Sequence, residues 1–194
     1  MLEWLLVATG FSGAWTLWFL WRKLVRLFTT PAESLVHFSL RGGCTDAVIA
    51  ELLAARREVL VLAYSFTSRP IAEALVATSG RGVKVTIVLD HSNEKEAHTE
   101  LPFLLGHGLR VLIDPHHAIA HNKVMLIDGH VVVTGSFNFT NQAEHENAEN
   151  LLILRGQREL VRRYRADFEA HEAHSRPAAA QHADASHHHH RRAA

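Results

Sequence analysis

The run HNKVMLIDGHVVVTGSFNFT, residues 121–140, decides the fold of this 194-residue chain. It contains two apolar segments, KVMLI and HVVVTG, which Asp128 and Gly129 separate. Asp-Gly between apolar runs is a strong signal for a β-hairpin with a two-residue type I′ turn, because both residues tolerate the positive φ angles of that turn. The run therefore predicts an antiparallel hairpin in which Ile127 faces His130.

The open end of this predicted hairpin collects polar side chains. In the predicted register His121 lies opposite Ser136 and Lys123 lies opposite Thr134. Asn138 falls on the same face because side chains alternate along a strand. Lys123 supplies a positive charge, Ser136 and Asn138 supply hydrogen-bond donors, and His121 can attack phosphorus or transfer a proton. The run thus predicts a phosphate-binding site that contains a nucleophile.

The rest of the chain alternates between strand and helix patterns. The predicted strands cover residues 34–40, 58–66, 83–90 and 109–114, and the predicted helices cover about 46–57, 70–78 and 94–106. The run EVLVLAYSF is apolar almost throughout, which is typical of a strand buried on both faces. These patterns predict an α/β fold whose sheet is covered by helices.

The spacing His121-x-Lys123, followed by Asp128 and by GSFN at 135–138, resembles the HKD signature of the phospholipase D superfamily. The segments AYSFTSRPIAEAL, RGVKVTIVLD, GSFNFT and NAENLLIL resemble its small single-motif members, the bacterial endonucleases and the mitochondrial cardiolipin hydrolases (Zucchini). The similarity covers about residues 34–168 and implies a layered α/β/α sandwich with a mixed sheet. The chain lacks the cysteine-rich zinc-binding stretch of the eukaryotic cardiolipin hydrolases.

In this superfamily one motif makes half of an active site, so a single motif implies a homodimer. The resemblance implies that one His121 attacks the phosphodiester to form a phosphohistidine, while the other protonates the leaving oxygen and then activates water. Glu149, in NAENLLIL, matches the glutamate that orients the histidine ring. Asp128 counts among the catalytic positions of the motif, but it lies roughly 23 Å along a strand from His121, which favours a role in the turn and the fold. No metal or other cofactor is implied.

Residues 1–29 form a separate segment. It carries Glu3 and then no charge until Arg22, and as a helix residues 2–21 would rise roughly 30 Å, the thickness of a bilayer's hydrocarbon core. All four tryptophans lie in it, and the basic residues follow the apolar run, unlike those of a cleaved signal peptide. We therefore expect a single-pass transmembrane anchor with the following domain on the cytoplasmic side.

The composition of the remaining chain limits its partners and cofactors. Between residues 30 and 170 the 17 acids outnumber the 14 bases, which argues against a broad basic surface for nucleic acid. The single cysteine, Cys44, excludes a disulfide framework and is expected to be a small buried residue. His116 and His117, just before the motif, either line the groove that would hold the substrate or are solvated loop histidines. Residues 171–194, rich in Ala, His and Arg, are expected to be disordered.

Together these features predict a membrane-anchored phosphodiesterase of the phospholipase D type, with its catalytic domain over residues 30–170. A tethered site and a body without excess positive charge favour a phospholipid substrate. A membrane-tethered endonuclease that acts on single-stranded DNA or RNA is the alternative, because the same chemistry cleaves both kinds of phosphodiester. A third hypothesis is an inactive scaffold that binds phosphate.

Overall fold

The computed structural model describes residue 15 and residues 17–23, 32–39 and 43–179. Trp15 and residues 17–23 are helical and their side chains are exposed. Most of the segment that was expected to anchor the chain, residues 1–29, lies outside the described residues. Within the described ranges, no helix combines the length and the apolar character needed to cross a membrane.

An eight-stranded mixed sheet forms the centre of the domain, with the strand order β1-β7-β6-β5-β2-β3-β4-β8. Strands β2, β3 and β4 are parallel to one another, whereas every other neighbouring pair is antiparallel. The strands are β1 (Glu33–Phe38), β2 (Glu58–Ala63), β3 (Lys84–Asp90), β4 (Arg110–Asp114), β5 (Lys123–Ile127), β6 (Val131–Gly135), β7 (Asn150–Arg155) and β8 (Arg176–Pro177). The predicted α/β fold with a mixed sheet is confirmed.

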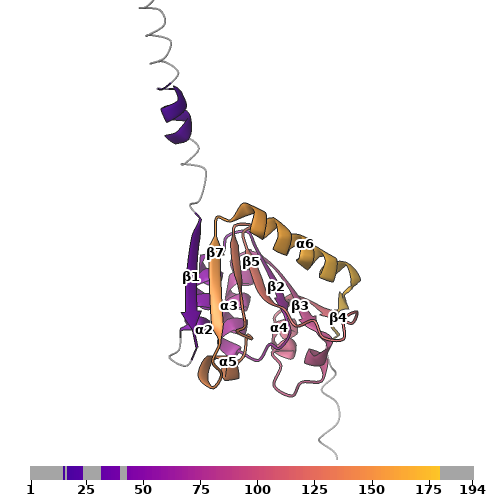
Figure 1. The fold of residues 1–194 in the computed structure, drawn as a ribbon. Helices are drawn as coiled ribbons and strands as arrows, with labels where there is room; N and C mark the ends of the chain where they lie inside the picture. The colour runs from indigo at the N-terminus through magenta and orange to yellow at the C-terminus, as the bar shows by residue number, and fades with distance from the viewer. Residues whose placement is uncertain (1–14, 16, 24–31, 40–42, 180–194) are drawn as a thin grey trace, which may run out of the picture.

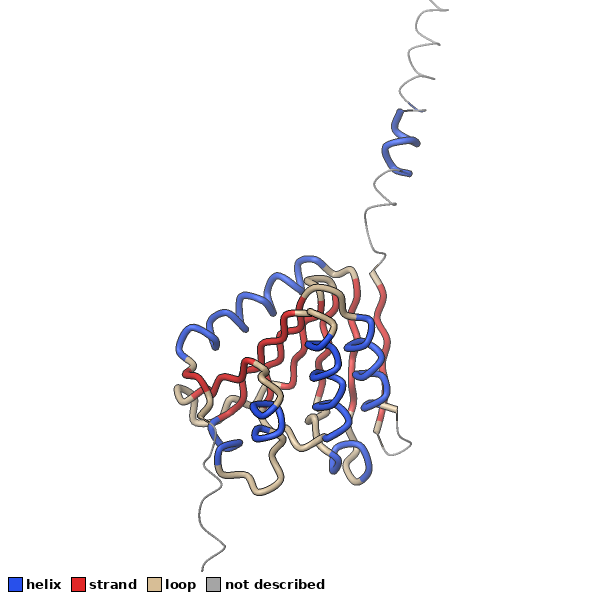
Figure 2. Tube along the Cα trace, turned by 180° about the vertical axis from the view of Figure 1, so that it is seen from behind, coloured by secondary structure: helices blue, strands red, loops and turns tan. Residues whose placement is uncertain are grey.

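Helices cover both faces of this sheet, which gives the expected three layers (Figures 1 and 2). One face carries α2 (Cys44–Ala54), α3 (Arg69–Gly80) and α4 (Leu101–Gly106), and the other carries α6 (Arg158–His174). The short α5 (Asn141–His145) lies between β6 and β7 in the chain. Pro70 and Pro102 stand in the first turns of α3 and α4, where a helix has no use for the missing N–H.

The alternation of side chains along β2 shows why its sequence is apolar throughout. Val59 and Val61 pack into the core beneath α2 and α3, whereas Leu60 and Leu62 pack into the core beneath α6. All four are almost fully buried. Full burial of such a side chain stabilises the fold by about 1.5–3 kcal/mol, so both faces of the strand contribute.

The helix expected over residues 94–106 is shorter than predicted. A single 3-10 turn, η1 (His91–Glu94), comes first, and α4 begins only at Leu101. The buried Asn93, within η1, donates hydrogen bonds to the carbonyls of Tyr64 at 2.5 Å and Asp90 at 3.1 Å. These bonds hold the segment in an irregular path because an asparagine side chain can replace the helical bonds of the backbone.

The ordered fold extends past residue 170, so the disorder expected from residue 171 is wrong for residues 171–177. Helix α6 continues to His174 because Phe168 and His171 keep its inner face buried. The chain then forms β8, in which Pro177 pairs with Leu112 of β4. Residues 180–194 lie outside the described ranges.

The hairpin of β5 and β6 has the predicted turn. Asp128 and Gly129 both have positive φ angles, 54° and 69°. The N–H of His130 donates to the carbonyl of Ile127 at 3.1 Å, which closes the turn. The carbonyl of His130, however, accepts a hydrogen bond from the N–H of Gly156 at 3.0 Å. The carbonyl of His130 is thereby bonded to the end of β7, and His130 joins Asp128 and Gly129 in the connection between β5 and β6.

The extra residue in this connection shifts the strand register by one from the prediction. Val131, and not His130, lies opposite Ile127, and Thr134 lies opposite Val124. The predicted register is therefore wrong, both for the pairing of Lys123 with Thr134 and for the placement of His121 opposite Ser136, which relied on it. A shift of one residue moves a side chain to the other face of the sheet, so Lys123 and Thr134 do not share a face.

Candidate active site

The candidate site lies at one edge of the sheet, where the parallel strands end and β5 begins. Ala63, the last residue of β2, pairs with Lys123, the first residue of β5. Just beyond this pair, the N–H of Tyr64 donates to the carbonyl of Asn122 at 2.9 Å. In open α/β sheets, ligands bind outside the carboxyl ends of the strands. His121 therefore lies at the edge where this architecture places its sites.

The imidazole of His121 is exposed and rests against an aromatic ring. Its centroid lies 4.6 Å from that of Tyr64, with the two planes inclined by 56°. Tyr64 follows β2 directly and is half-buried, so it forms a fixed surface beside the imidazole. Sequence reasoning missed this contact, because only the pairing of β2 with β5 brings the two residues together.

Lys123 brings a buried ammonium group to the same place. Its side chain is only 8% exposed, and Nζ donates to the carbonyl of His121 at 3.0 Å. Nζ also lies 5.4 Å from the centroid of the Tyr64 ring, within the range of a cation–π contact. Burial lowers the pKa of Lys123, and the nearby carboxylate of Glu149 opposes this shift. A buried ammonium is costly without an anionic partner, so this position favours an incoming phosphate.

Ser136 is exposed and bonded to β7. Its Oγ donates to Oδ1 of Asn150 at 3.1 Å and accepts from the backbone N–H of Asn150 at 3.0 Å. The preceding Gly135, with φ of 149°, allows this close approach, because a Cβ there would meet the carbonyl oxygen of Asn150 at 2.2 Å. The hydroxyl must turn away from Asn150 to donate to a phosphate.

Asn138 lies on a segment that runs beside the carboxyl end of β2. The next residue, Phe139, forms a parallel bridge with Phe66, and its carbonyl accepts from the N–H groups of Thr67 and Ser68, both at 3.0 Å. Oδ1 of Asn138 is buried and has no hydrogen-bond partner among the described residues. The amide oxygen of Asn138 thus has no partner in the described part of the chain, whereas the hydroxyl of Ser136 is bonded to Asn150.

Asp128 stands at the other end of β5 from His121, as its distance along the chain predicted. It is 6% exposed, and its carboxylate accepts from the N–H groups of Arg56, Arg57 and Glu58 at 2.9, 2.7 and 3.0 Å. Burial would raise the pKa of Asp128, but these backbone bonds hold it below its usual range. The carboxylate joins the turn of the hairpin to the start of β2.

Glu149 lies between α5 and β7, and its backbone is bonded to Ser39, which directly follows β1. Its N–H donates to Oγ of Ser39 at 2.8 Å, and its carbonyl accepts from the N–H of Ser39 at 3.1 Å. Its carboxylate accepts from Nδ2 of Asn147 at 2.9 Å. Its charge acts on the buried groups of Lys123 and Cys44. The predicted orientation of the His121 ring by Glu149 stays a prediction, since the ring contact of His121 in the described chain is with Tyr64.

Five of the six predicted site residues fall into three groups, and Asn138 lies on the separate segment beside the carboxyl end of β2. His121 and Lys123 are in direct contact through the backbone of His121. Ser136 and Glu149 are linked through β7, where Asn150 follows Glu149 and bonds Ser136, and the charge of Glu149 acts on Lys123. Asp128 is remote from the others.

The chain has clear relatives. The family model described as "Cardiolipin synthase, PLD-like domain" matches residues 48–172. A phospholipase D of Rickettsia conorii is 39% identical over 142 residues, which are 73% of this chain and 66% of that protein. A mitochondrial cardiolipin hydrolase of Xenopus tropicalis is 33% identical over 118 residues, 61% of this chain and 56% of that protein. The chain therefore spans less than two thirds of these curated relatives.

Solved structures show the same fold. Nuc from Salmonella typhimurium, described as a phospholipase D family member, is 29% identical with a TM-score of 0.74, covering 76% of this chain and 99% of that one. NucT from Helicobacter pylori, at 23% identity, has a TM-score of 0.68 and covers 75% of this chain and 98% of that one. The second likeness supports the fold alone.

Proposed function

The chain belongs to the phospholipase D superfamily, and we propose that it is a phosphodiesterase that hydrolyses phospholipids through a phosphohistidine at a homodimeric site. One observation carries the proposal. An exposed imidazole, that of His121, stands beside a buried ammonium, that of Lys123, at the ligand-binding edge of the sheet. The imidazole is free to attack, and the ammonium stabilises the negative charge that develops on the phosphoryl oxygens.

The reaction runs in two steps. The imidazole of one subunit is the nucleophile, and the imidazole of the other acts as an acid in the first step and as a base in the second. A ring nitrogen of His121 attacks phosphorus and forms a P–N bond, while the bond from phosphorus to the leaving oxygen breaks. The imidazolium of His121 of the partner subunit gives its proton to that oxygen. The now neutral imidazole then takes a proton from water, whose oxygen attacks phosphorus and releases the first histidine. The products are an alcohol and a phosphate monoester.

The homodimer is supported by the single motif in each chain and by apolar side chains around the site. Ile119, two residues before His121, is 58% exposed, and Phe38 is 66% exposed. Phe38 borders a depression of about 300 Å³ that Glu149 and Asn150 also line. Such side chains are costly to leave in water, and a second copy of the chain would bury them.

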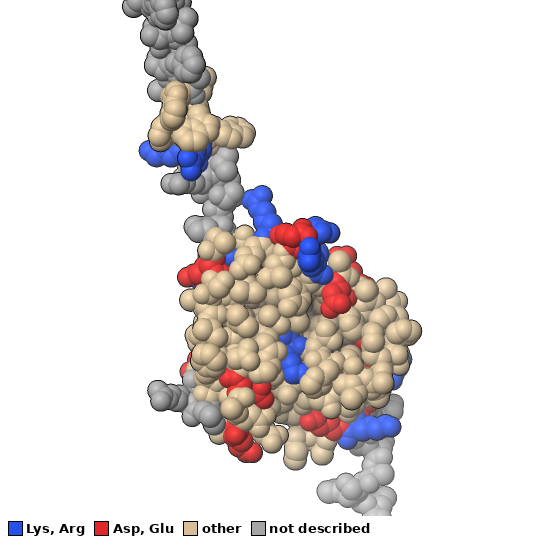
Figure 3. Space-filling model, in the orientation of Figure 1, with Lys and Arg blue, Asp and Glu red and all other residues tan. Residues whose placement is uncertain are grey.

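A phospholipid substrate is supported by the charge of the surface and by the names of the relatives. Acidic and basic side chains are interspersed on the face in Figure 3, which shows no broad basic surface. Binding to nucleic acid relies on such a surface, because phosphate contacts supply most of its affinity. The relatives above are named as a phospholipase D and a cardiolipin hydrolase.

The membrane anchor is a part of this proposal that rests on sequence. The apolar run before Arg22, its tryptophans and the basic residues that follow support a single pass with the domain in the cytoplasm. An anchor would hold the site at the surface where its substrate is concentrated.

The test compares substrates with one matched pair of variants. The full chain in detergent is given phospholipid vesicles and, separately, labelled single-stranded DNA and RNA, without added metal. His121→Asn removes the nucleophile, and His107→Asn is its control, because His107 is exposed and lies at the opposite edge of the sheet, before β4.

We expect the wild type and His107→Asn to release head group and His121→Asn to release none. Cleavage of the oligonucleotides alone would make the protein the alternative, a nuclease of the same chemistry. Binding of vesicles without turnover in any variant would contradict the enzyme and support the phosphate-binding scaffold.

A further inference from the structure

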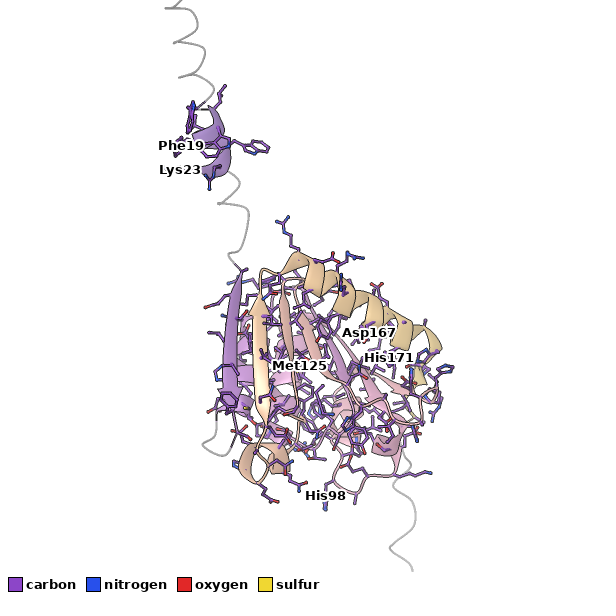
Figure 4. The ribbon with its side chains drawn as sticks, viewed as in Figure 1. Phe19, Lys23, His98, Met125, Asp167 and His171 are labelled. Atoms are coloured by element: carbon purple, nitrogen blue, oxygen red, sulfur yellow. The ribbon has the colours of Figure 1, made fainter. Side chains whose placement is uncertain are left out.

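A second cluster of polar side chains lies away from His121, where β4, the loop after it and the end of α6 meet. Asp114 ends β4, His117 lies in the loop, and His171 and His174 are on the last turns of α6. Figure 4 shows His171 at this end of the helix, beside the sheet. Each of the four residues offers one ligand atom, and these atoms all lie within 4.8 Å of one another. No other group of this kind occurs in the described part of the chain.

The three imidazoles converge on one carboxylate oxygen. Oδ2 of Asp114 lies 2.6 Å from Nδ1 of His171, 3.0 Å from Nδ1 of His117 and 3.2 Å from Nε2 of His174. One carboxylate oxygen has about two lone-pair sites, so it cannot satisfy three donors with good geometry. Nε2 of His174 is in fact buried without a well-formed hydrogen bond.

Two of the four residues, Asp114 and His171, are buried, and the other two are only partly exposed. The side chain of Asp114 is 0% exposed and that of His171 is 10% exposed, whereas His117 at 43% leaves a path to solvent. The other carboxylate oxygen of Asp114, Oδ1, accepts from the backbone N–H of His116 at 2.8 Å. The cluster is thus enclosed around Asp114 and His171 and reaches solvent at His117.

We propose that Asp114, His117, His171 and His174 bind one zinc ion in a closed, four-coordinate site. Imidazole nitrogen and carboxylate oxygen are ligands that zinc takes at about 2.0–2.2 Å, and structural zinc sites have four protein ligands. A cation among the four atoms would satisfy Nε2 of His174 and relieve the crowding on the carboxylate. Residues 171 and 174 lie on one face of α6 because positions three apart on a helix are neighbours.

The bound ion would fix the loop that leads to the active site. The loop begins after Asp114 and ends at Ala120, whose N–H donates to the buried carboxylate of Asp90 at 2.7 Å. His121 follows directly. Zinc would join the start of this loop to α6, so it would hold the loop in place while taking no part in the chemistry at phosphorus.

The test measures zinc directly and uses the full chain in detergent. The four consecutive histidines at 187–190 would bind the same metal, so they are replaced by alanine in every protein compared. After dialysis, zinc is counted per chain by mass spectrometry of the metal. Replacement by cobalt adds a second readout, since tetrahedral cobalt absorbs strongly in the visible range. Thermal unfolding is recorded with and without zinc at about 100 times its dissociation constant.

We expect one zinc ion per chain, a tetrahedral cobalt spectrum and a rise of about 5–10 °C in the unfolding temperature. His174→Gln and Asp114→Asn, which keep the size of the side chain, should lose all three signals. His116→Gln should keep them, because the ring of His116 stacks on that of His174 at 4.7 Å but supplies no ligand.

Two results would overturn the proposal. One is less than a tenth of a zinc ion per wild-type chain, which would leave the cluster as a hydrogen-bond network. The other is full zinc binding by His174→Gln and Asp114→Asn, which would place the metal elsewhere. Neither depends on hydrolytic activity, so the site stands or falls separately from the proposed function.

Discussion

Replacement of Asp128 by alanine should destabilise the fold and leave the chemistry of the folded protein intact. The carboxylate accepts three backbone N–H groups, from Arg56, Arg57 and Glu58, at 2.7–3.0 Å. A hydrogen bond to a charged group contributes about 1.5–3 kcal/mol, and water can reach part of this turn. We therefore expect Asp128→Ala to lower the free energy of unfolding by about 3–5 kcal/mol, which is a large share of the stability of a domain of this size.

Asparagine at the same position is the matched control. It keeps one carbonyl oxygen for the N–H groups of Arg57 and Glu58, and it tolerates the φ of 54° at this position. We expect Asp128→Asn to lose about 1–2 kcal/mol. Urea unfolding followed by circular dichroism measures both variants, and activity is measured per folded molecule below the transition.

The pH dependence gives the prediction a second test. The folded pKa of Asp128 is depressed, so its contribution is complete well above the unfolded value of 3.8 and is lost as the pH falls through the folded value. The difference in stability between wild type and Asp128→Asn should therefore shrink below about pH 4. A variant that is as stable as the wild type but lacks activity would refute this account of Asp128.

Three further predictions follow from packing and burial. Gly135→Ala should lower the free energy of unfolding in urea by about 2–4 kcal/mol, because the added Cβ would meet the carbonyl oxygen of Asn150 at 2.2 Å. An unchanged unfolding midpoint would contradict this close approach of the two backbones. Burial, followed by the charges of two nearby glutamates, raises the pKa of the Cys44 thiol to about 11. A thiol reagent at pH 8 should therefore modify Cys44 only when the protein unfolds, and rapid modification of the native protein would contradict its burial. Tyr64→Ala should lower the turnover rate about 10- to 100-fold, because it removes the ring that holds the imidazole of His121 in place. Tyr64→Phe should keep the wild-type rate. An equal loss of rate in both variants would show that the hydroxyl of Tyr64, and not its ring, is what matters.

The sequence predicted those features that depend on local pattern. The apolar run of β2 indicated a strand buried on both faces, and Val61 and Leu62 do pack into opposite cores. Asp128-Gly129 indicated a turn with positive φ angles, and both residues have them. Such features depend on neighbours in the chain, so a single sequence contains the information.

Features that depend on distant partners could not be predicted in this way. The hairpin register differs from the prediction because the carbonyl of His130 accepts from the N–H of Gly156, which directly follows β7. Asp114 and His171 are 57 residues apart, and only the packing of α6 on the sheet brings them together. The composition of residues 171–194 predicts disorder, and it does not indicate that His171 and His174 meet Asp114.

The most direct test of the proposed mechanism is to capture the covalent intermediate. The full chain is mixed with phospholipid vesicles, denatured within the first turnover and digested, and the peptide that contains His121 is examined by mass spectrometry. The mechanism predicts a phosphatidyl group on His121 in the wild type that disappears as the product forms. Turnover with no adduct at His121, or undiminished turnover by His121→Asn, would contradict it.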